Sequence, residues 1–295
     1  MISVLDHGHV ALRNLAGPTR RLTKYQGSHQ IIDRPFDADD VDPANSARMS
    51  FDQMDSGRTR AEDLKLCDYL MANWHSTPFE MIECWFDMKL PIFVARQFVR
   101  HRTVSINEVS GRYVTLPAEW YIPEIVGAKS TSGAKQGQEN TLHDLVQKSF
   151  KAALGEACED SYNQYLYFLD KGVAPEHARM FLHLNHYTHW LWKQDLHNVM
   201  HFLRLRDHFH AQIEAQKYAQ ATDALLREQL PESMGLYDKY RRQKMKEVKA
   251  YLFQNLADPT DLPELSFTDD LTPADRDAGW TSTALFIEVE MPRGR

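Results

Sequence analysis

The clearest local pattern in the chain is an alternation of apolar and polar side chains between residues 81 and 90. Apolar residues take every second position from Ile82 onward, and charged residues take most of the positions between them. A period of two is typical of a strand with one buried face. Pro91 suits the first turn of a helix, which we expect to run over residues 91–102. The pattern therefore predicts a strand that leads directly into a helix.

The second half of the chain has the longer period of helices, with apolar residues three and four positions apart. Four helices are expected, over residues 140–171, 174–184, 193–230 and 237–254. The longest carries an apolar stripe through Leu196, Val199, Met200 and Leu203, and Pro231 is expected to end it.

Shorter segments complete the predicted organisation. Residues 112–116 and 284–291 are expected to be strands, and residues 127–137, rich in glycine, serine, lysine and glutamine, an exposed loop. No internal repeat is evident, and the composition does not shift before about residue 255. We therefore expect one α+β domain over residues 1–254, followed by an acidic, proline-containing extension, residues 255–295, of unknown role.

The bulk composition narrows the class of protein. With 295 residues, 43% of them hydrophobic, the chain is long enough to bury a full core. A formal net charge of −7 argues against a nucleic-acid or membrane-surface binder, because such proteins carry a basic excess. Three cysteines without a Cys-x-x-Cys pair favour neither a disulfide framework nor a thiolate metal site. Without a membrane-length apolar run or a signal-peptide pattern, a cytoplasmic protein is expected.

Residues 100–113 concentrate the polar chemistry of the chain. Arg100, His101 and Arg102 place three permanent or potential cations side by side, which a folded protein tolerates best where an anion shares them. Hydroxyl, amide and glycine positions follow, on a backbone that can bend closely around a ligand. Ser110 is also a candidate nucleophile, with His101 as its base, but the arginines favour a phosphate contact. The segment predicts a phosphate site.

The apolar stripe of the longest predicted helix, continued in steps of three and four, reaches Arg206 and then His210. Burying a guanidinium without a partner is costly. Arg206 is therefore expected either to pair with an internal carboxylate, Glu214 or Asp207, or to meet an anionic ligand. The pattern leaves both alternatives open.

Histidines are concentrated in the helical half, where His197 and His201 stand four residues apart, as helical metal ligands often do. The sequence has neither His-Glu-x-x-His nor Glu-x-x-His, so the carboxylate partners of zinc peptidases and di-iron bundles are missing. We expect most of these histidines to face solvent or form hydrogen bonds, and we expect no metal.

Residues 75–80, His-Ser-Thr-Pro-Phe-Glu, precede the predicted strand. They form either a simple turn into the strand or a ligand contact through His75 and Thr77. Neither a glycine-rich dinucleotide fingerprint nor a Walker loop is found, so a nucleotide would be held by a less common fold.

The segment Arg-His-Arg-x-x-Ser-x-Asn-Glu-x-Ser-x-Arg-Tyr at residues 100–113 resembles the signature of the flavin-dependent thymidylate synthases. The resemblance covers roughly residues 1–230. Its other parts are residues 75–80, 91–97, 195–198, 205–206 and 210–212. A motif of this length is far more specific than a lone Gly-x-Gly-x-x-Gly.

The resemblance implies an α+β fold of its own kind, an antiparallel sheet with long helices, in a homotetramer with active sites where subunits meet. It also implies reductive methylation of dUMP to dTMP, with carbon from 5,10-methylenetetrahydrofolate and hydride from NADPH by way of FAD. Anionic molecules at the site would explain local cations on an acidic protein.

The resemblance also implies roles for individual residues. The positions that match FAD contacts are Ser50, Thr77, Arg100, His101, Arg102, Glu108, Asp195, Leu196, His197 and His201. The positions that match dUMP contacts are Gln97, Phe98, Val99, Arg100, Glu108, Val109, Ser110, Gly111, Arg112, Arg179 and Arg206. Arg206 would be catalytic: it would stabilise negative charge as N3 of uracil loses its proton, so that hydride can reach C6.

Two other functions are compatible with parts of the pattern. The density of histidines and the phosphate-like segment also suit a metal-dependent nucleotide phosphohydrolase. A non-catalytic nucleotide sensor would keep the phosphate segment but would leave an inward-facing Arg206 without a role.

Overall fold

The computed structural model describes residues 1–18, 22–25, 28–31, 38–54, 58–129, 138–208 and 211–242. Residues Met1–Arg241 form one compact unit. The predicted domain boundary at residue 254, the late strand and the acidic extension lie outside the described residues and stay predictions. In the part of the chain that is described, no helix combines the length and the apolar character needed to cross a membrane.

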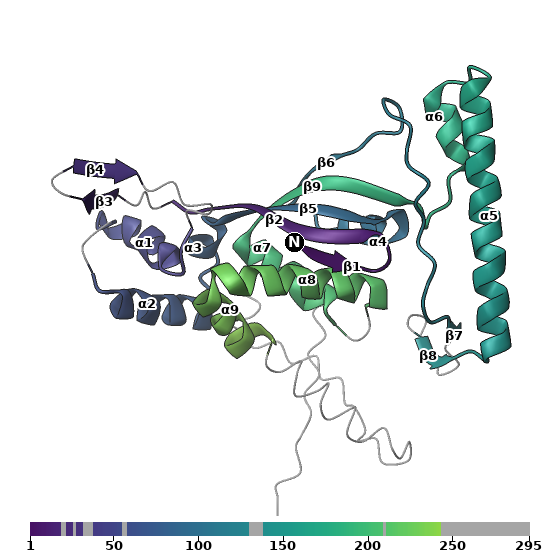
Figure 1. Ribbon diagram of the computed structural model, residues 1–295. Coiled ribbons are helices and arrows are strands. Elements are labelled where there is room, and N and C mark those ends of the chain that lie inside the picture. Colours follow the sequence, from purple (N-terminus) through teal and green to yellow (C-terminus); the bar gives the residue numbers. More distant parts are fainter. Residues whose placement is uncertain are drawn as a thin grey trace, which may run out of the picture. The chain divides into compact units, whose positions relative to one another are not determined.

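A five-stranded antiparallel sheet lies at the centre of this unit (Figure 1). Its strands, in spatial order, are β1 (Ile2–Val4), β2 (Gly8–Ala16), β5 (Glu83–Pro91), β9 (Tyr187–Asp195) and β6 (Ser105–Glu108). Two small sheets pair β3 (Leu22–Tyr25) with β4 (Ser28–Ile31) and β7 (Gly127–Lys129) with β8 (Gln138–Thr141). The order brings strands from distant parts of the sequence next to each other, with β5 between β2 and β9.

Helices cover one face of the sheet, where α7 and α8 pack together and α8 lies against β2 (Figure 1). The helices are α1 (Asp42–Arg48), α2 (Arg60–Ala72), α3 (Thr77–Glu80), α4 (Ile92–Phe98), α5 (Asp144–Asp170), α6 (Pro175–Ala178), α7 (Leu196–Arg206), α8 (Ile213–Gln229) and α9 (Pro231–Tyr237). Short 3₁₀ turns occupy Met49–Phe51 and Arg179–Phe181, and Asp238–Arg242 is a π-helical turn. The result is the predicted α+β fold with an antiparallel sheet.

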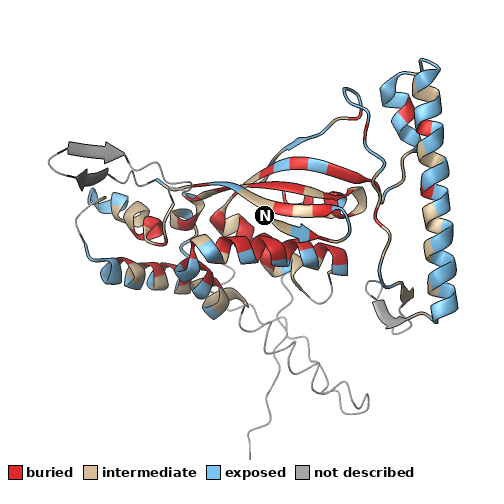
Figure 2. Ribbon diagram, viewed as in Figure 1, coloured by how far each residue is buried: buried red, intermediate tan, exposed pale blue. Residues whose placement is uncertain are grey.

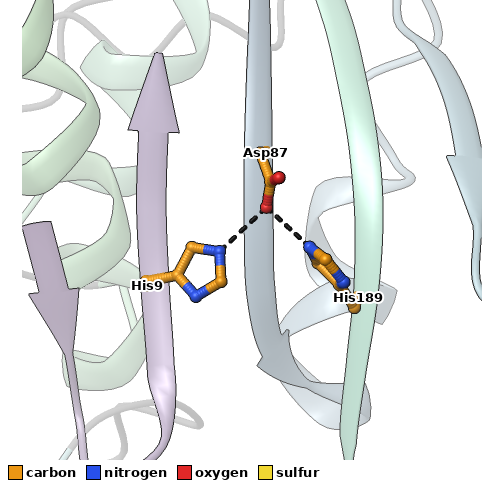
Figure 3. Close-up of side chains that lie close together, drawn as sticks. All are labelled: His9, Asp87 and His189. Carbon is orange, nitrogen blue, oxygen red and sulfur yellow. Dashed lines mark hydrogen bonds and ion pairs between the residues drawn. The ribbon is translucent and has the colours of Figure 1, made fainter. Parts of the chain in front are cut away.

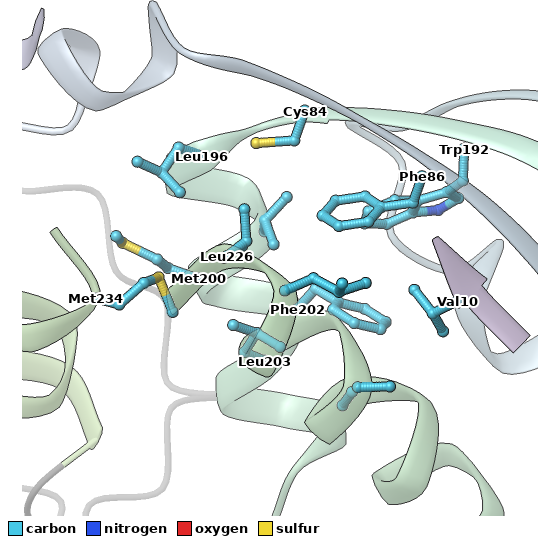
Figure 4. Close-up of a cluster of buried hydrophobic side chains, with 14 of the residues drawn as sticks. Val10, Cys84, Phe86, Trp192, Leu196, Met200, Phe202, Leu203, Leu226 and Met234 are labelled. Carbon is cyan, nitrogen blue, oxygen red and sulfur yellow. The ribbon is translucent and has the colours of Figure 1, made fainter. Parts of the chain in front are cut away.

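Much of the core lies between the sheet and α7, α8 and α9 (Figure 4). Trp192 of β9 contacts Phe86 of β5 and Phe202 of α7, with ring centroids 5.8 and 5.3 Å apart. Leu226 and Met234 close the cluster from α8 and α9. Because large aromatic side chains contribute much of the buried apolar area, this cluster fixes α7 firmly against the sheet.

The alternation between residues 81 and 90 is confirmed as β5. Ile82, Cys84, Phe86, Met88 and Leu90 are all fully buried. Their regular spacing places the remaining side chains of β5 on the outer face of the sheet, opposite the helices.

The single long helix predicted over residues 193–230 is wrong. The region contains the end of β9, then α7, then a break before α8. Buried Trp190 and Trp192 alternate with more exposed neighbours, which is the period of two of a strand. Asp195 then starts α7 as its N-cap, because its carboxylate accepts the backbone N–H of Asn198 at 2.9 Å. Pro231 does not simply end a helix but begins α9.

The predicted strand over residues 112–116 is also wrong, and the strand of this region is β6. The backbone N–H groups of Tyr113 and Val114 donate to the carbonyl of Ser110 at 2.9 and 3.2 Å, which forms a turn. The hydroxyl of Ser110 accepts the N–H of Arg112 at 3.3 Å, and such local bonds compete with sheet ladders. The preceding helix, α4, ends at Phe98 instead of near residue 102.

The remaining elements differ in extent. The helix predicted over residues 140–171 is confirmed as α5, but only its Cys158 and Tyr165 are buried, and Figure 2 shows exposed residues along nearly its whole length. The next predicted helix is limited to α6 and a 3₁₀ turn, and residues 75–80 contain α3. The predicted loop at residues 127–137 begins with β7, and its other residues lie outside the described part, as do residues 243–254.

Candidate functional site

Arg206 lies in the last turn of α7 and is half-buried. Its Nε donates to Nε2 of His101 at 3.0 Å, and its Nη2 donates to the backbone carbonyl of Gln97 at 2.9 Å. Within the described residues no carboxylate pairs with Arg206, and Glu214 instead accepts from the hydroxyl of Tyr121 at 3.2 Å. The internal salt bridge is therefore not formed. His210, the next residue of the predicted stripe, lies outside the described residues.

His101 is a buried acceptor for this arginine. Burial, followed by the nearby charges of Arg206 and His201, lowers the pKa of His101 to about 4. The imidazole is therefore neutral at pH 7, with Nε2 free of a proton and able to accept from Arg206. The ring of His101 also contacts the ring of Phe202, with centroids 5.1 Å apart, so the core of the protein sets its orientation.

The guanidinium of Arg206 is thus held in place without being neutralised. Burial lowers its pKa, but an arginine remains charged at neutral pH because its ordinary pKa is far higher. A partly desolvated cation that is fixed by neutral acceptors is suited to binding an anion or to stabilising negative charge that develops in a reaction.

Arg100 and Arg102 follow α4 on a loop and are exposed. In the described part of the chain neither side chain has a hydrogen bond or an ion pair. The cation cluster predicted from residues 100–102 therefore consists of two exposed guanidiniums and the buried, neutral His101. Two unneutralised cations suit a phosphate-bearing ligand.

His197 and His201 lie one turn apart on α7. Burial lowers the pKa of His197, while Glu80 of α3 and Asp195 act in the opposite direction. Burial also lowers the pKa of His201, together with nearby cations. Among the described residues, no third metal-ligating side chain joins this pair. The lowered pKa values favour the neutral form of both imidazoles at pH 7, and the ring of His201 lies 6.1 Å from that of His101, measured between ring centroids.

A second group forms where the turn at residues 110–114 meets α6. Nε of Arg112 donates to Oε2 of Glu176 at 3.2 Å. A Cβ atom at Gly111 would lie 3.0 Å from Cδ1 of Leu116 and 3.4 Å from Cδ of Arg179, so both side chains lie against the turn at this position. Ser110, Gly111, Arg112 and Arg179 thus lie close together.

The other residues predicted to contact ligands differ in how far they are buried. Glu108 accepts from the hydroxyl of Thr188. The side chains of Phe98 and Leu196 are fully buried in the core, whereas Val99, Val109, Ser50 and Thr77 are exposed. Within the described residues no hydrogen bond or ion pair joins the group around Arg206 to the group around Arg112.

Three partners were not predicted from the sequence. Gln212 accepts from Gln97 at 2.6 Å, Thr188 contacts Glu108, and Glu176 pairs with Arg112. The alternation along β9 could have indicated Thr188, because it places residues 188, 190, 192 and 194 on the inner face. Gln212 belongs to residues 210–212, which are part of the resemblance, but no role was predicted for it, and Glu176 has no sequence signal of either kind.

Comparison with known proteins gives a consistent result. The model of the family described as thymidylate synthase complementing protein matches residues 31–232. The chain is 40% identical over 239 residues to the flavin-dependent thymidylate synthase of Ehrlichia ruminantium (strain Gardel), covering 80% of this chain and 72% of that protein. It is 40% identical over 226 residues to that of Thermus thermophilus, covering 77% and 81%.

Among solved structures, the fold is similar to that of the UMP/dUMP methylase PolB from Streptomyces cacaoi bound with 5-Br dUMP. The TM-score is 0.66 at 24% identity, and the similarity covers 82% of this chain and 99% of the methylase chain.

Proposed function

Because the chain belongs to the thymidylate synthase complementing protein family, we propose that it is a flavin-dependent thymidylate synthase that methylates dUMP to dTMP. In this proposal 5,10-methylenetetrahydrofolate donates the carbon and NADPH supplies the reducing hydride through FAD. The relatives support this activity and not a nucleotide phosphohydrolase.

The observation that carries the proposal is the half-buried guanidinium of Arg206, which has two neutral anchors and, in the described residues, no carboxylate. We assign it the stabilisation of negative charge on the uracil ring as N3 loses its proton. The N–H groups of Arg206 that its two anchors leave unused are available to the substrate. Since His101 and Gln97 fix the side chain beforehand, little reorganisation is needed during the reaction.

We propose that dUMP is held by the residues predicted for it: Gln97, Phe98, Val99, Arg100, Glu108, Val109, Ser110, Gly111, Arg112, Arg179 and Arg206. The phosphate suits this turn, where the backbone N–H of Arg112 donates to the Ser110 hydroxyl and Cδ of Arg179 lies against Gly111, because both arginines can supply guanidinium donors. Phe98 contributes through its backbone, because its side chain is fully buried.

The flavin supplies the redox chemistry of the reaction when it is bound. The described residues fit an FAD molecule, since the exposed, unpaired Arg100 and Arg102 suit a pyrophosphate and the neutral histidines of α7 can share hydrogen bonds with polar ring edges. Leu196 contributes through its backbone only, because its side chain is buried. The proposed contacts are Ser50, Thr77, Arg100, His101, Arg102, Glu108, Asp195, Leu196, His197 and His201.

We also propose a cytoplasmic homotetramer with active sites shared between subunits. Among the described residues no hydrogen bond or ion pair joins the Arg206 group to the Arg112 group, which is compatible with sites that another subunit completes. Exposed apolar residues on α5, including Leu145, Val146 and Phe150, support burial against another subunit. Light scattering should give about four times the 34.2 kDa of one chain. The mass of a monomer would contradict the tetramer.

Purified protein tests the function directly. It should release flavin on denaturation and should convert dUMP to dTMP only when 5,10-methylenetetrahydrofolate and NADPH are both supplied. Matched reactions that omit each component in turn serve as controls. The proposal fails if flavin can be neither retained nor added back and no dTMP forms. Release of phosphate from dUMP would instead support the phosphohydrolase.

A further inference from the structure

Three side chains that can ligate metals converge on the outer face of the sheet (Figure 3). They are His9 of β2, Asp87 of β5 and His189 of β9, and their ligand atoms all lie within 4.8 Å of one another. Nε2 of His9 lies 2.8 Å from Oδ1 of Asp87, and Nε2 of His189 lies 2.6 Å from the same oxygen. In the described part of the chain this is the one such group of three.

The register of the central strands explains the convergence. His9 and His189 both lie opposite Lys89, one on each side of β5, and Asp87 is two residues before Lys89 on the same face. The intervening Met88 points into the core. The three ligands are therefore placed by paired strands at the middle of the sheet, which hold side chains more precisely than loops do.

A bulge in β2 adds a fourth residue. The register shifts between Leu12 and Asn14, which makes Arg13 the extra residue on this strand. The guanidinium of Arg13 donates to Oδ2 of Asp87 through Nε at 2.8 Å and also through Nη2. Oδ1 is left to the histidines. Arg13 thus orients the carboxylate from behind, as the outer-shell partners of metal ligands commonly do.

Two permanent cations lie near the cluster, and each has a carboxylate partner. Nε of Arg13 donates to Oδ2 of Asp87, and Nζ of Lys89 lies 2.6 Å from Oε2 of Glu119. Oδ1 of Asp87, which lies between the two histidines, is the carboxylate oxygen left for an ion.

The distances are close to those of a metal site. Metal bonds of about 2.1 Å place neighbouring ligand atoms about 3.0–3.4 Å apart. The present separations of 2.8 and 2.6 Å between nitrogen and oxygen need to open by only several tenths of an ångström. The side chain of His189 is 50% exposed and that of His9 is 23% exposed, so an ion can enter from solvent and keep water ligands.

We propose that His9, Asp87 and His189 bind one divalent transition-metal ion, with Zn²⁺ as the probe ion, and leave coordination positions open. Two imidazoles and one carboxylate are a donor set that suits this class of ion. The proposal goes beyond thymidylate synthesis and does not depend on it.

Calorimetric titration of Zn²⁺ into the flavin-loaded, full-length protein tests the site. The protein is prepared without a polyhistidine tag and freed of metal with a chelator. One ion per chain should bind, and His9→Ala and His189→Ala should each weaken binding by about 10–100-fold. His177→Ala removes an exposed histidine outside the cluster and should bind as the unaltered protein does.

Absence of saturable binding overturns the proposal, as does equal affinity of the cluster variants and His177→Ala. In that case the network only ties three strands together. Because His189 is half-exposed, its removal should leave the fold intact, which urea denaturation of the same samples verifies. Flavin content and dTMP formation, measured on these samples, report on the proposed function separately.

Discussion

Histidines take part in two networks on this sheet, and the charge at the centre of each network differs in sign. On the helix-covered side, His101 accepts from Arg206, and among the described residues no carboxylate pairs with Arg206. On the outer face, His9 and His189 surround the carboxylate of Asp87. Imidazole side chains therefore hydrogen-bond to a cation in the first network and to an anion in the second.

The comparison shows how the environment selects the ligand. His101 is kept neutral by burial and by the neighbouring cation, so it fixes Arg206 without neutralising it. Asp87 is held by Arg13 through Oδ2 and presents Oδ1 to the two histidines. The first network suits an anionic substrate and the second a metal ion.

Substitution of Arg206 should have the largest effect on turnover. Arg206→Ala should lower kcat by about 10²–10³-fold, because a preorganised donor to developing negative charge is lost. Flavin content should change little, whereas Arg102→Ala and His197→Ala should deplete the flavin. Arg206→Lys keeps the positive charge but not the forked geometry of the guanidinium. Its kcat should therefore lie between that of Arg206→Ala and that of the unaltered protein. Steady-state kinetics and the visible spectrum measure both effects, and normal turnover in Arg206→Ala would remove its assigned role.

The neutrality of His101 should be visible in the pH dependence of stability. Its pKa is about 4 in the folded state, against an ordinary value of 6.5, so the unfolded chain takes up the proton first as the pH falls. His101 should therefore lower the free energy of unfolding by up to about 3 kcal/mol between pH 6.5 and 4, and contribute nothing above that range.

His101→Gln should flatten this part of the profile, as measured by urea denaturation at each pH. His186 is a matched control, since burial also lowers its pKa to about 4. His186→Gln should flatten the profile similarly but leave kcat unchanged, whereas His101→Gln should also lower kcat because Arg206 loses an anchor. A His101→Gln profile parallel to that of the unaltered protein would contradict the neutral state of His101.

The second network should depend on the charge of Asp87. Asp87→Asn keeps the shape but weakens the bonds from His9, His189 and Arg13, and should lower the free energy of unfolding at pH 7 by about 1–3 kcal/mol. Because the folded pKa of Asp87 is depressed, this stabilisation is present at neutral pH and is lost only in strong acid. Asp170→Asn, at a side chain that is 76% exposed, is the control. If both substitutions lower the free energy of unfolding equally, the hydrogen bonds of Asp87 contribute no more to stability than a surface carboxylate does.

The sequence predicted one of these networks much better than the other. Arg206 and residues 100–113 were identified because a local motif and one helical stripe carry them. The cluster of His9, Asp87 and His189 was not, because it depends on the pairing of three strands that are distant in sequence. Register across such strands is decided by tertiary packing and leaves no local pattern.

The errors in the predicted helices and strands also arise where local pattern and tertiary packing disagree. β5 alternates strictly and was predicted correctly. The end of β9 was missed because the helix predicted from the stripe at Leu196, Val199, Met200 and Leu203 was extended back to residue 193, past the N-cap Asp195. The partner of Arg112, Glu176 on α6, is a tertiary contact between distant segments and could not be predicted.

The smallest effects are expected at Arg112. This arginine differs from Arg206 because it has a carboxylate partner, Glu176. The side chains of Arg112 and Glu176 are about half exposed, so their ion pair should contribute at most about 1 kcal/mol to stability. Glu176→Gln should therefore unfold at nearly the same urea concentration. It should also bind dUMP a few-fold more tightly in a calorimetric titration, because the phosphate no longer competes with Glu176 for Arg112. Glu159→Gln, at an exposed position of α5, should change neither quantity. If dUMP affinity stays the same in Glu176→Gln, Arg112 does not bind the phosphate, and the anion is held by the unpaired arginines alone.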